Sequence, residues 1–180
     1  MRHATAYAGV APRPFHEVLA QLSIDFEKFT FIDFGSGKGR ALMLASEYPF
    51  AKIIGVDFSP RLNGIAEANL RAYQNPARQC SAIELKCMDA TEYEIPAEPA
   101  VLFFFNPFGE DLTRLIAKKL QASLQDYPRA VLVVYFWPTA RKAWDELGTL
   151  QSVSVRQPAW AWPAHRGREI VAVWRTQAET

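Results

Sequence analysis

This chain has few metal-binding side chains and almost no net charge, and each of these features argues against a class of function. Only two cysteines and three histidines occur in 180 residues, and their spacing does not match a metal site. We therefore expect no bound metal and two reduced thiols. The formal net charge is only +1, which leaves no large electrostatic footprint for nucleic acid or an anionic membrane. Nucleic acid is accordingly disfavoured as a partner.

Long apolar segments are also missing. The longest apolar run, residues 130–137, falls far short of the ~18 residues that a membrane helix needs. The first residues lack a charged start followed by an apolar core, so no signal peptide is apparent. We expect a cytoplasmic protein without a membrane-spanning segment.

A glycine-rich turn between two apolar runs is the most informative feature that is present. Residues 31–40 read FIDFGSGKGR, and a second apolar run ends on Asp57. Strand, glycine turn, helix, strand and acid in this order are typical of a nucleotide-type pocket at the carboxyl ends of parallel strands. The glycines allow close approach of the backbone to a ligand, and Asp57 is placed to accept hydrogen bonds from a ribose diol.

Two common nucleotide motifs do not fit this turn. A dinucleotide-binding fingerprint would need glycine where Arg40 stands. A phosphate-binding P-loop would need glycine at Ile32 and Ser or Thr at Gly39. A nucleotide-binding oxidoreductase therefore remains only as a disfavoured alternative.

The remaining pattern, G-x-G-x-G with Asp33 before it, resembles motif I of the class I S-adenosylmethionine (SAM)-dependent methyltransferases. Residues 83–90 resemble the third strand of that family and the acid that receives the adenine amino group. Residues 101–108 resemble its fourth strand and catalytic loop. The likeness covers residues 28–137 and is greatest to small bacterial members with no assigned substrate.

This resemblance implies SAM as the cofactor. The helix beginning near Gly39 would face the methionine carboxylate, and Asp33 would engage the amino group unless it caps that helix. Asp57 would bind the ribose, its alternative being an N-cap for the helix that starts near Pro60. The implied cofactor-binding residues are Asp33, Gly35, Ser36, Gly37, Gly39, Asp57, Phe58, Asp89, Ala90 and Asn106.

The adenine end of this set has its own expected roles. Phe58 would pack on one face of the ring, although an aromatic residue there could also belong to the core. Asp89 would accept from the exocyclic amine and the Ala90 N–H would reach a ring nitrogen. The alternative for Asp89 is a capped turn before Tyr93.

The expected catalytic residues are Asn106, Pro107 and Phe108. Methyl transfer from a sulfonium is an in-line displacement, so the enzyme mainly positions a nucleophile. Amine-methylating relatives carry Asp/Asn-Pro-Pro-Tyr/Phe here, whereas this chain has Phe108 at the second proline and Gly109 at the aromatic place. A rigid turn that closes the strand is the alternative reading.

We therefore expect methyl transfer to a nitrogen of a small molecule or protein side chain. Because Phe108 and Gly109 depart from the family motif, a second function stays open: a SAM-binding sensor or partner subunit without catalysis. A homodimer is also expected as an option, since a second subunit could complete an open substrate cleft. Further candidates to shape the acceptor pocket are Tyr7, Tyr135, Trp137, Trp160, Trp162 and His165.

The fold class follows from alternating patterns. Strands are expected at 29–34, 52–57, 82–87, 100–105 and 130–136, and helices at 38–48, 60–74, 110–125 and 139–147. Residues 152–155 and 169–174 predict a carboxyl-terminal antiparallel hairpin. Together they predict a single-domain, Rossmann-like α/β fold, with a mostly parallel seven-stranded sheet and helices on both faces.

Two regions are expected along the chain. Residues 1–27 would form an arm, extended over 1–14, and a short helix over 15–22. Residues 28–180 would form the SAM-binding methyltransferase domain. The continuous apolar runs of the fourth and fifth strands predict central positions in the sheet, and Cys87 is expected to be buried.

Overall fold

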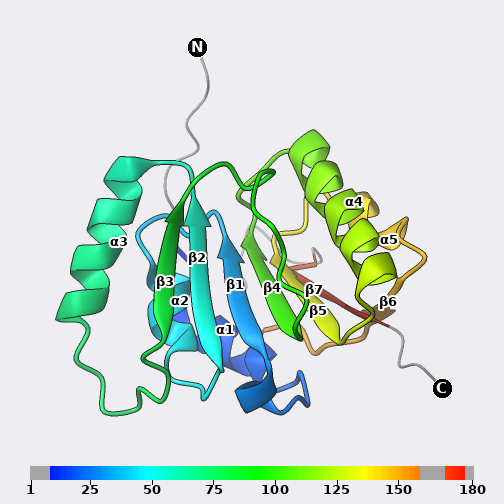
Figure 1. Cartoon of the computed structure of the whole chain (residues 1–180). Helices are drawn as coiled ribbons and strands as arrows, with labels where there is room; N and C mark the ends of the chain where they lie inside the picture. Colours follow the sequence, from blue (N-terminus) through cyan, green and yellow to red (C-terminus); the bar gives the residue numbers. More distant parts are fainter. Residues whose placement is uncertain (1–8, 159–168, 177–180) are drawn as a thin grey trace.

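Seven strands form one sheet in the order β3-β2-β1-β4-β5-β7-β6 (Figure 1). The computed structural model describes residues 9–158 and 169–176. The strands are β1 (Thr30–Phe34), β2 (Lys52–Asp57), β3 (Ile83–Cys87), β4 (Ala100–Phe105), β5 (Val131–Phe136), β6 (Leu150–Val153) and β7 (Val171–Thr176). The first five are parallel, and β7 runs antiparallel between β5 and β6. The predicted sheet and its terminal hairpin are confirmed.

Helices cover both faces of the sheet, as predicted (Figure 1). They are α1 (Pro12–Leu19), α2 (Arg40–Ala45), α3 (Pro60–Ala72), α4 (Glu110–Asp126) and α5 (Lys142–Asp145), with a short 3₁₀ turn at Phe26–Lys28. One core cluster joins α4 and α5 to the sheet, and a second joins α1 and α2 to the opposite face. Leu70 of α3 packs against the second cluster.

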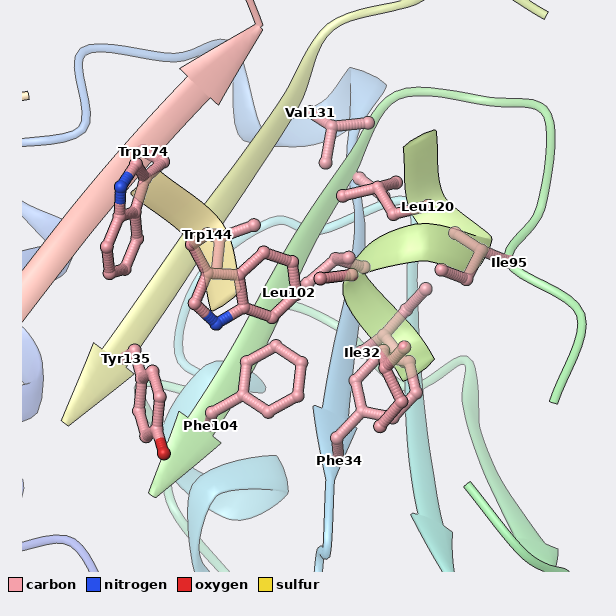
Figure 2. Close-up of a cluster of buried hydrophobic side chains, with 14 of the residues drawn as sticks. Ile32, Phe34, Ile95, Leu102, Phe104, Leu120, Val131, Tyr135, Trp144 and Trp174 are labelled. Atoms are coloured by element: carbon pink, nitrogen blue, oxygen red, sulfur yellow. The ribbon is translucent and has the colours of Figure 1, made fainter. Parts of the chain in front are cut away.

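The central strands β4 and β5 are almost wholly buried, which confirms the positions predicted from their continuous apolar runs. Aromatic rings fill the face beneath α4 and α5 (Figure 2). The Phe34 and Phe104 rings stack with centroids 5.0 Å apart, and Trp144 lies 5.2 Å from Phe104. Because these rings tie β1 to β4 and α5, the strand ends beyond them are held rigidly.

The first helix begins within the segment that was predicted to be extended. α1 starts at Pro12 because proline suits the first turn of a helix, where its missing N–H is not needed. It ends at Leu19, three residues before the predicted end. The predicted apolar face is nevertheless correct, since Phe15, Val18 and Leu19 are fully buried and Leu22 is nearly so.

Other boundaries and one burial prediction were wrong. α2 and α5 are shorter than predicted, because left-handed Gly39 precedes α2 and turns flank α5. β6 lies two residues earlier, and β7 two residues later, than predicted, as their antiparallel register requires. Cys87 is exposed, because it ends β3 at the edge of the sheet.

Candidate functional site

Apart from Ser23, which precedes β1, the left-handed residues among those described lie at one edge of the sheet, where the parallel strands β1, β4 and β5 end. Gly35, Gly37 and Gly39 have φ of 79°, 54° and 79° in the turn after β1, called here the glycine loop (residues 35–39). Asn106 follows β4 with φ 44°, and Trp137 follows β5 with φ 54°. Such conformations are costly for residues other than glycine and concentrate at functional sites. We take this edge as the candidate site.

The glycine loop is in direct contact with the turn after β4, called here the acceptor turn (residues 106–109). A Cβ added to Gly35 would lie 2.4 Å from the Cβ of Pro107. The Gly35 and Ser36 N–H groups both donate to the Val56 carbonyl, at 2.8 and 3.1 Å. Glycine is therefore required at position 35 both for its left-handed φ and for this close approach.

Asp57 ties the glycine loop to the start of α3. Its carboxylate is only 8% exposed and accepts from the Gly37 N–H and the Ser59 N–H, each at 2.9 Å. The N-cap of α3 is Ser59, whose Oγ accepts from Leu62 N–H at 3.3 Å, so the capping alternative for Asp57 is wrong. An ionised carboxylate has about four acceptor positions, which leaves two for ligand hydroxyls.

Asn63 positions Asp57, and the sequence reasoning missed it. Its Nδ2 donates to the backbone carbonyls of Asp57 and Ser59, at 2.9 and 3.0 Å. The Asn63 side chain is nearly buried, and its Oδ1 has no hydrogen-bond partner in the part of the chain that the structure describes. An asparagine one turn past the Ser59 cap was the available signal, but a helix-surface role would give the same pattern.

Asp33 is even more buried than Asp57, with 3% of its surface exposed. Among the residues that the structure describes, no group donates a hydrogen bond to its carboxylate. Burial, and then the negative charge of Asp57, raise the pKa of Asp33 to about 8. Asp33 does not cap α2, whose N-cap is Gly39 without a side-chain bond. This carboxyl group therefore suits a cationic ligand group.

Phe58 and Ser36, two predicted cofactor-binding residues near Asp57 and Asp33, differ in exposure. Phe58 directly follows Asp57 and is 76% exposed, so its ring is available to stack on a planar group. Ser36 is buried, and a Cβ on Gly55 would lie 2.9 Å from its Oγ. The Ser36 side chain thus faces the sheet, where no described residue hydrogen-bonds its Oγ.

Asp89 caps a turn, as its alternative reading predicted. Its Oδ1 accepts from the N–H and the hydroxyl of Thr91, at 2.8 and 2.7 Å, and these bonds lower the pKa of Asp89. The residue is exposed, and Oδ2 takes no part in the turn. Ala90 beside it is buried and belongs to the core under α4.

Asn106 is exposed at the acceptor turn but is held by a residue of β5 and by one in the turn that follows β5. Its Oδ1 accepts from Thr139 Oγ1 at 2.6 Å and from the hydroxyl of Tyr135 at 3.3 Å. Tyr135 is fully buried, so only its hydroxyl reaches toward this edge (Figure 2). Phe108 is half-buried and packs against the core cluster under α4 and α5. Tyr7, Trp160, Trp162 and His165 lie outside the described residues.

A separate groove of about 810 Å³ runs between α3 and the edge strand β3. Leu70, Ile83 and Leu85 contribute its apolar lining, and it does not include the glycine loop or the acceptor turn. Within residues 9–158 and 169–176, no group of three His, Cys, Asp or Glu side chains could hold a metal ion. The helices in those ranges are all too short or too polar to cross a membrane.

No model of a known protein family matches the chain, and no curated protein matches it. Solved structures do match over nearly its whole length. The tRNA (m1A58) methyltransferase TrmI from Aquifex aeolicus is 15% identical with a TM-score of 0.64, over 97% of this chain and 72% of that one. An RNA methyltransferase from Salinibacter ruber, in complex with S-adenosyl-L-homocysteine, is 16% identical with a TM-score of 0.57, over 96% of both chains.

The methyltransferase domain of bacterial CtHen1-C is also 16% identical, with a TM-score of 0.60, over 93% of this chain and 98% of that one. Identities this low establish the fold and leave the substrate open. The chain has the class I methyltransferase fold that its motifs predicted.

Proposed function

We propose that this protein transfers a methyl group from SAM to a nitrogen of a small molecule or a protein side chain. The observation that carries the proposal is the bond between the glycine loop and Asp57 at 2.9 Å. It joins a left-handed loop to a buried acid at the carboxyl ends of β1 and β2, in a sheet of methyltransferase strand order.

Several described residues support SAM as the cofactor. Asp33 is a buried carboxyl group with no hydrogen-bond donor among these residues, and it suits the amino group of the methionine end. Asp57 has acceptor positions for ribose hydroxyls, and exposed Phe58 offers a face to adenine. At the glycine loop, a side chain at Gly35 would collide with Pro107, so close backbone approach is built into the sequence.

Bound SAM supplies a methyl group on a positively charged sulfur, and transfer needs an acceptor lone pair held in line. The contact between Gly35 and Pro107 supports the acceptor turn as the place where that acceptor lies. Asn106 and Pro107 are the two positions shared with amine-methylating relatives, which favours nitrogen. Two similar structures are RNA methyltransferases, but a net charge of +1 argues against an RNA substrate here.

A SAM-binding protein without catalysis is the second candidate function, and the acceptor turn supports it. Asn106 Oδ1 already accepts hydrogen bonds from two hydroxyl groups, so it has little capacity left to accept a hydrogen bond from an amine. The relatives use an aromatic side chain to stack on substrate where this chain has Gly109, and the neighbouring Phe108 packs against the core instead.

Thermal unfolding with SAM, S-adenosylhomocysteine or NAD tests the cofactor. At about 100 times Kd, linkage stabilises the folded state by about 2.7 kcal/mol, which raises Tm by several degrees. We expect both SAM ligands to raise Tm and NAD to leave it unchanged. A rise with NAD alone would sink the proposal.

Methyl turnover separates the two candidate functions. Methyl-labelled SAM is incubated with the protein and with fractionated extracts of protein or of small molecules. Label transferred to a product, and lost in a Gly35→Ala variant, supports the enzyme. Tight binding of both SAM ligands without transfer in either fraction supports the sensor or partner subunit.

A further inference from the structure

The strand β3 forms one edge of the sheet, and alternate residues of its backbone face outward (Figure 1). Met88 N–H donates to the Asp57 carbonyl of β2 at 3.1 Å, and in the parallel register every second residue before Met88 also bonds to β2. The N–H and C=O groups of Ile83, Leu85 and Cys87 are therefore directed away from the sheet. Among the described residues, no group outside the sheet bonds to the backbone of Leu85 or Cys87. Such an open row is a template for another strand.

The side chains of β3 divide between two faces. Ile83 and Leu85 pack against the core cluster beneath α1 and α2. Glu84 and Lys86 lie on the opposite face, where Glu84 binds Lys86 at 2.8 Å and Lys52 of β2 at 2.6 Å. The chain passes from β3 to β4 without a helix, so no helix follows β3 to cover these charges.

The charges on β3 are self-complementary. When a second copy pairs antiparallel with Leu85 opposite Leu85, Glu84 of each copy lies opposite Lys86 of the other. These are non-hydrogen-bonded pairs, in which the Cβ atoms come within about 4.5–5.5 Å. The two neighbouring antiparallel registers would instead place Glu84 opposite Glu84 or Lys86 opposite Lys86. The charge pattern therefore favours one register about a two-fold axis.

The apolar face fits the same register. Leu70 of α3 and the side chains of Ile83 and Leu85 line the groove of about 810 Å³ between α3 and β3. In this pairing, Leu85 of the second copy lies beside Leu85 at the open side of the groove. Ile83 lies opposite the small side chain of Cys87. Each copy thus offers the other the same patch, as a two-fold interface requires.

We propose that β3 is a dimerisation edge, to which a second copy of this chain adds its own β3 antiparallel. Leu85 exchanges its N–H and C=O with Leu85 of the other copy, and the two sheets join into one. Because strand direction reverses across the two-fold axis, the two candidate sites lie at opposite ends of the joined edge. The association needs no cofactor and is independent of the proposed function.

Sedimentation velocity over a concentration series tests the dimer with the full chain. The wild type should approach twice the mass of one chain. Glu84→Lys and Lys86→Glu each place like charges at both paired positions, so each should weaken self-association at least about tenfold. A one-to-one mixture of these two variants should associate again, as should the double variant, because opposite charges then face each other. Asp126→Lys, at the exposed end of α4 and across the molecule from α3 (Figure 1), is the control for charge and should associate as the wild type does.

Disulfide trapping tests the register and does not rely on charge reversal. In a Cys87→Ser background, Leu85→Cys places two thiols at a hydrogen-bonded pair whose Cα atoms lie about 5.5 Å apart, within reach of a disulfide. Ser81→Cys in the same background is the control, since this exposed residue and its copy would lie about 27 Å apart. Oxidation by copper-phenanthroline should give a covalent dimer of the first variant and not of the second.

Each result decides for or against the β3 dimer. A wild type that stays monomeric at every concentration overturns it, and Glu84 and Lys86 then guard the edge against pairing. A wild-type dimer that neither charge reversal weakens must use another surface. Mixed variants that fail to associate, or equal trapping of both cysteine variants, exclude the proposed register. None of these results changes the expected binding of SAM, so the proposed function is tested separately.

Discussion

Pro107 packs so closely on Gly35 that a Cβ added to the glycine would lie 2.4 Å from the Cβ of the proline. This contact joins the loop after β1 to the turn after β4, two segments some 70 residues apart in sequence. The glycine loop and the acceptor turn therefore cannot move independently.

Gly35→Ala should lower the free energy of unfolding by at least about 2 kcal/mol, because it adds both a left-handed alanine and a clash with a rigid ring. Gly64→Ala is the matched control, since its Cβ meets open space in the middle of α3 and should stabilise by about 0.5–1 kcal/mol. Chemical denaturation measures both.

A double-mutant cycle with Pro107→Gly isolates the contact. Removing the proline ring should recover the clash part of the Gly35→Ala loss but not the part due to left-handed φ. Strictly additive free energies for the two substitutions would show that the alanine methyl group and the proline ring do not compete for this space.

Phe58→Ala should weaken binding of S-adenosylhomocysteine while leaving Tm almost unchanged. The ring is 76% exposed, so its loss costs little packing, whereas base stacking on an aromatic ring contributes about 1–3 kcal/mol. Tyr127→Ala, at the end of α4 and 60% exposed, is the control and should leave Kd unchanged. Equal Kd values for wild type and Phe58→Ala would remove Phe58 from the adenine site.

Asn106→Gly should be more stable than Asn106→Ala by roughly 1 kcal/mol. Both variants lose the bonds from Thr139 and Tyr135, but only alanine strains the left-handed backbone at φ 44°. At Gly64, an ordinary helical position, the order should be reversed. If alanine is favoured at both positions, the left-handed backbone is not present in solution.

Stability should fall with rising pH through Asp33. Burial and Asp57 raise the pKa of Asp33 from 3.8 to about 8, so the folded protein holds a proton that the unfolded chain has released. Unfolding then releases that proton, and stability falls by up to about 1.4 kcal/mol per pH unit between pH 4 and 8. Asp33→Asn should lack this component. Denaturation curves of both proteins across that range give the difference, and parallel pH profiles would contradict the assignment.

The hydrophobic pattern of the sequence was enough to predict the fold, because the features that define each strand and helix are local in the sequence. The apolar runs of β4 and β5 predicted a buried centre, and two strands without an intervening helix predicted the antiparallel end. The ends of α1, α2 and α5 were misplaced because caps and turns depend on a few residues whose competing preferences tertiary packing decides. Cys87 was misplaced although two charged residues within β3, Glu84 and Lys86, are typical of an edge strand.

The site divides in the same way. Sequence by itself determined which backbone can be left-handed, at Gly35, Gly37 and Gly39, and which acid follows the second strand, because these depend on residue type and local order. Only the tertiary structure decided how the acids are supported. Asp57 takes its two donors from Gly37 and Ser59, whereas buried Asp33 has no donor within residues 9–158 and 169–176.

Tertiary structure likewise placed Pro107 on Gly35 and joined Asn106 to Thr139 and Tyr135, 33 and 29 residues away. Such contacts depend on strand order and register, which bring distant segments to one edge of the sheet. The residues at that edge can be predicted from the sequence, but the residues that they contact are determined by how the sheet packs.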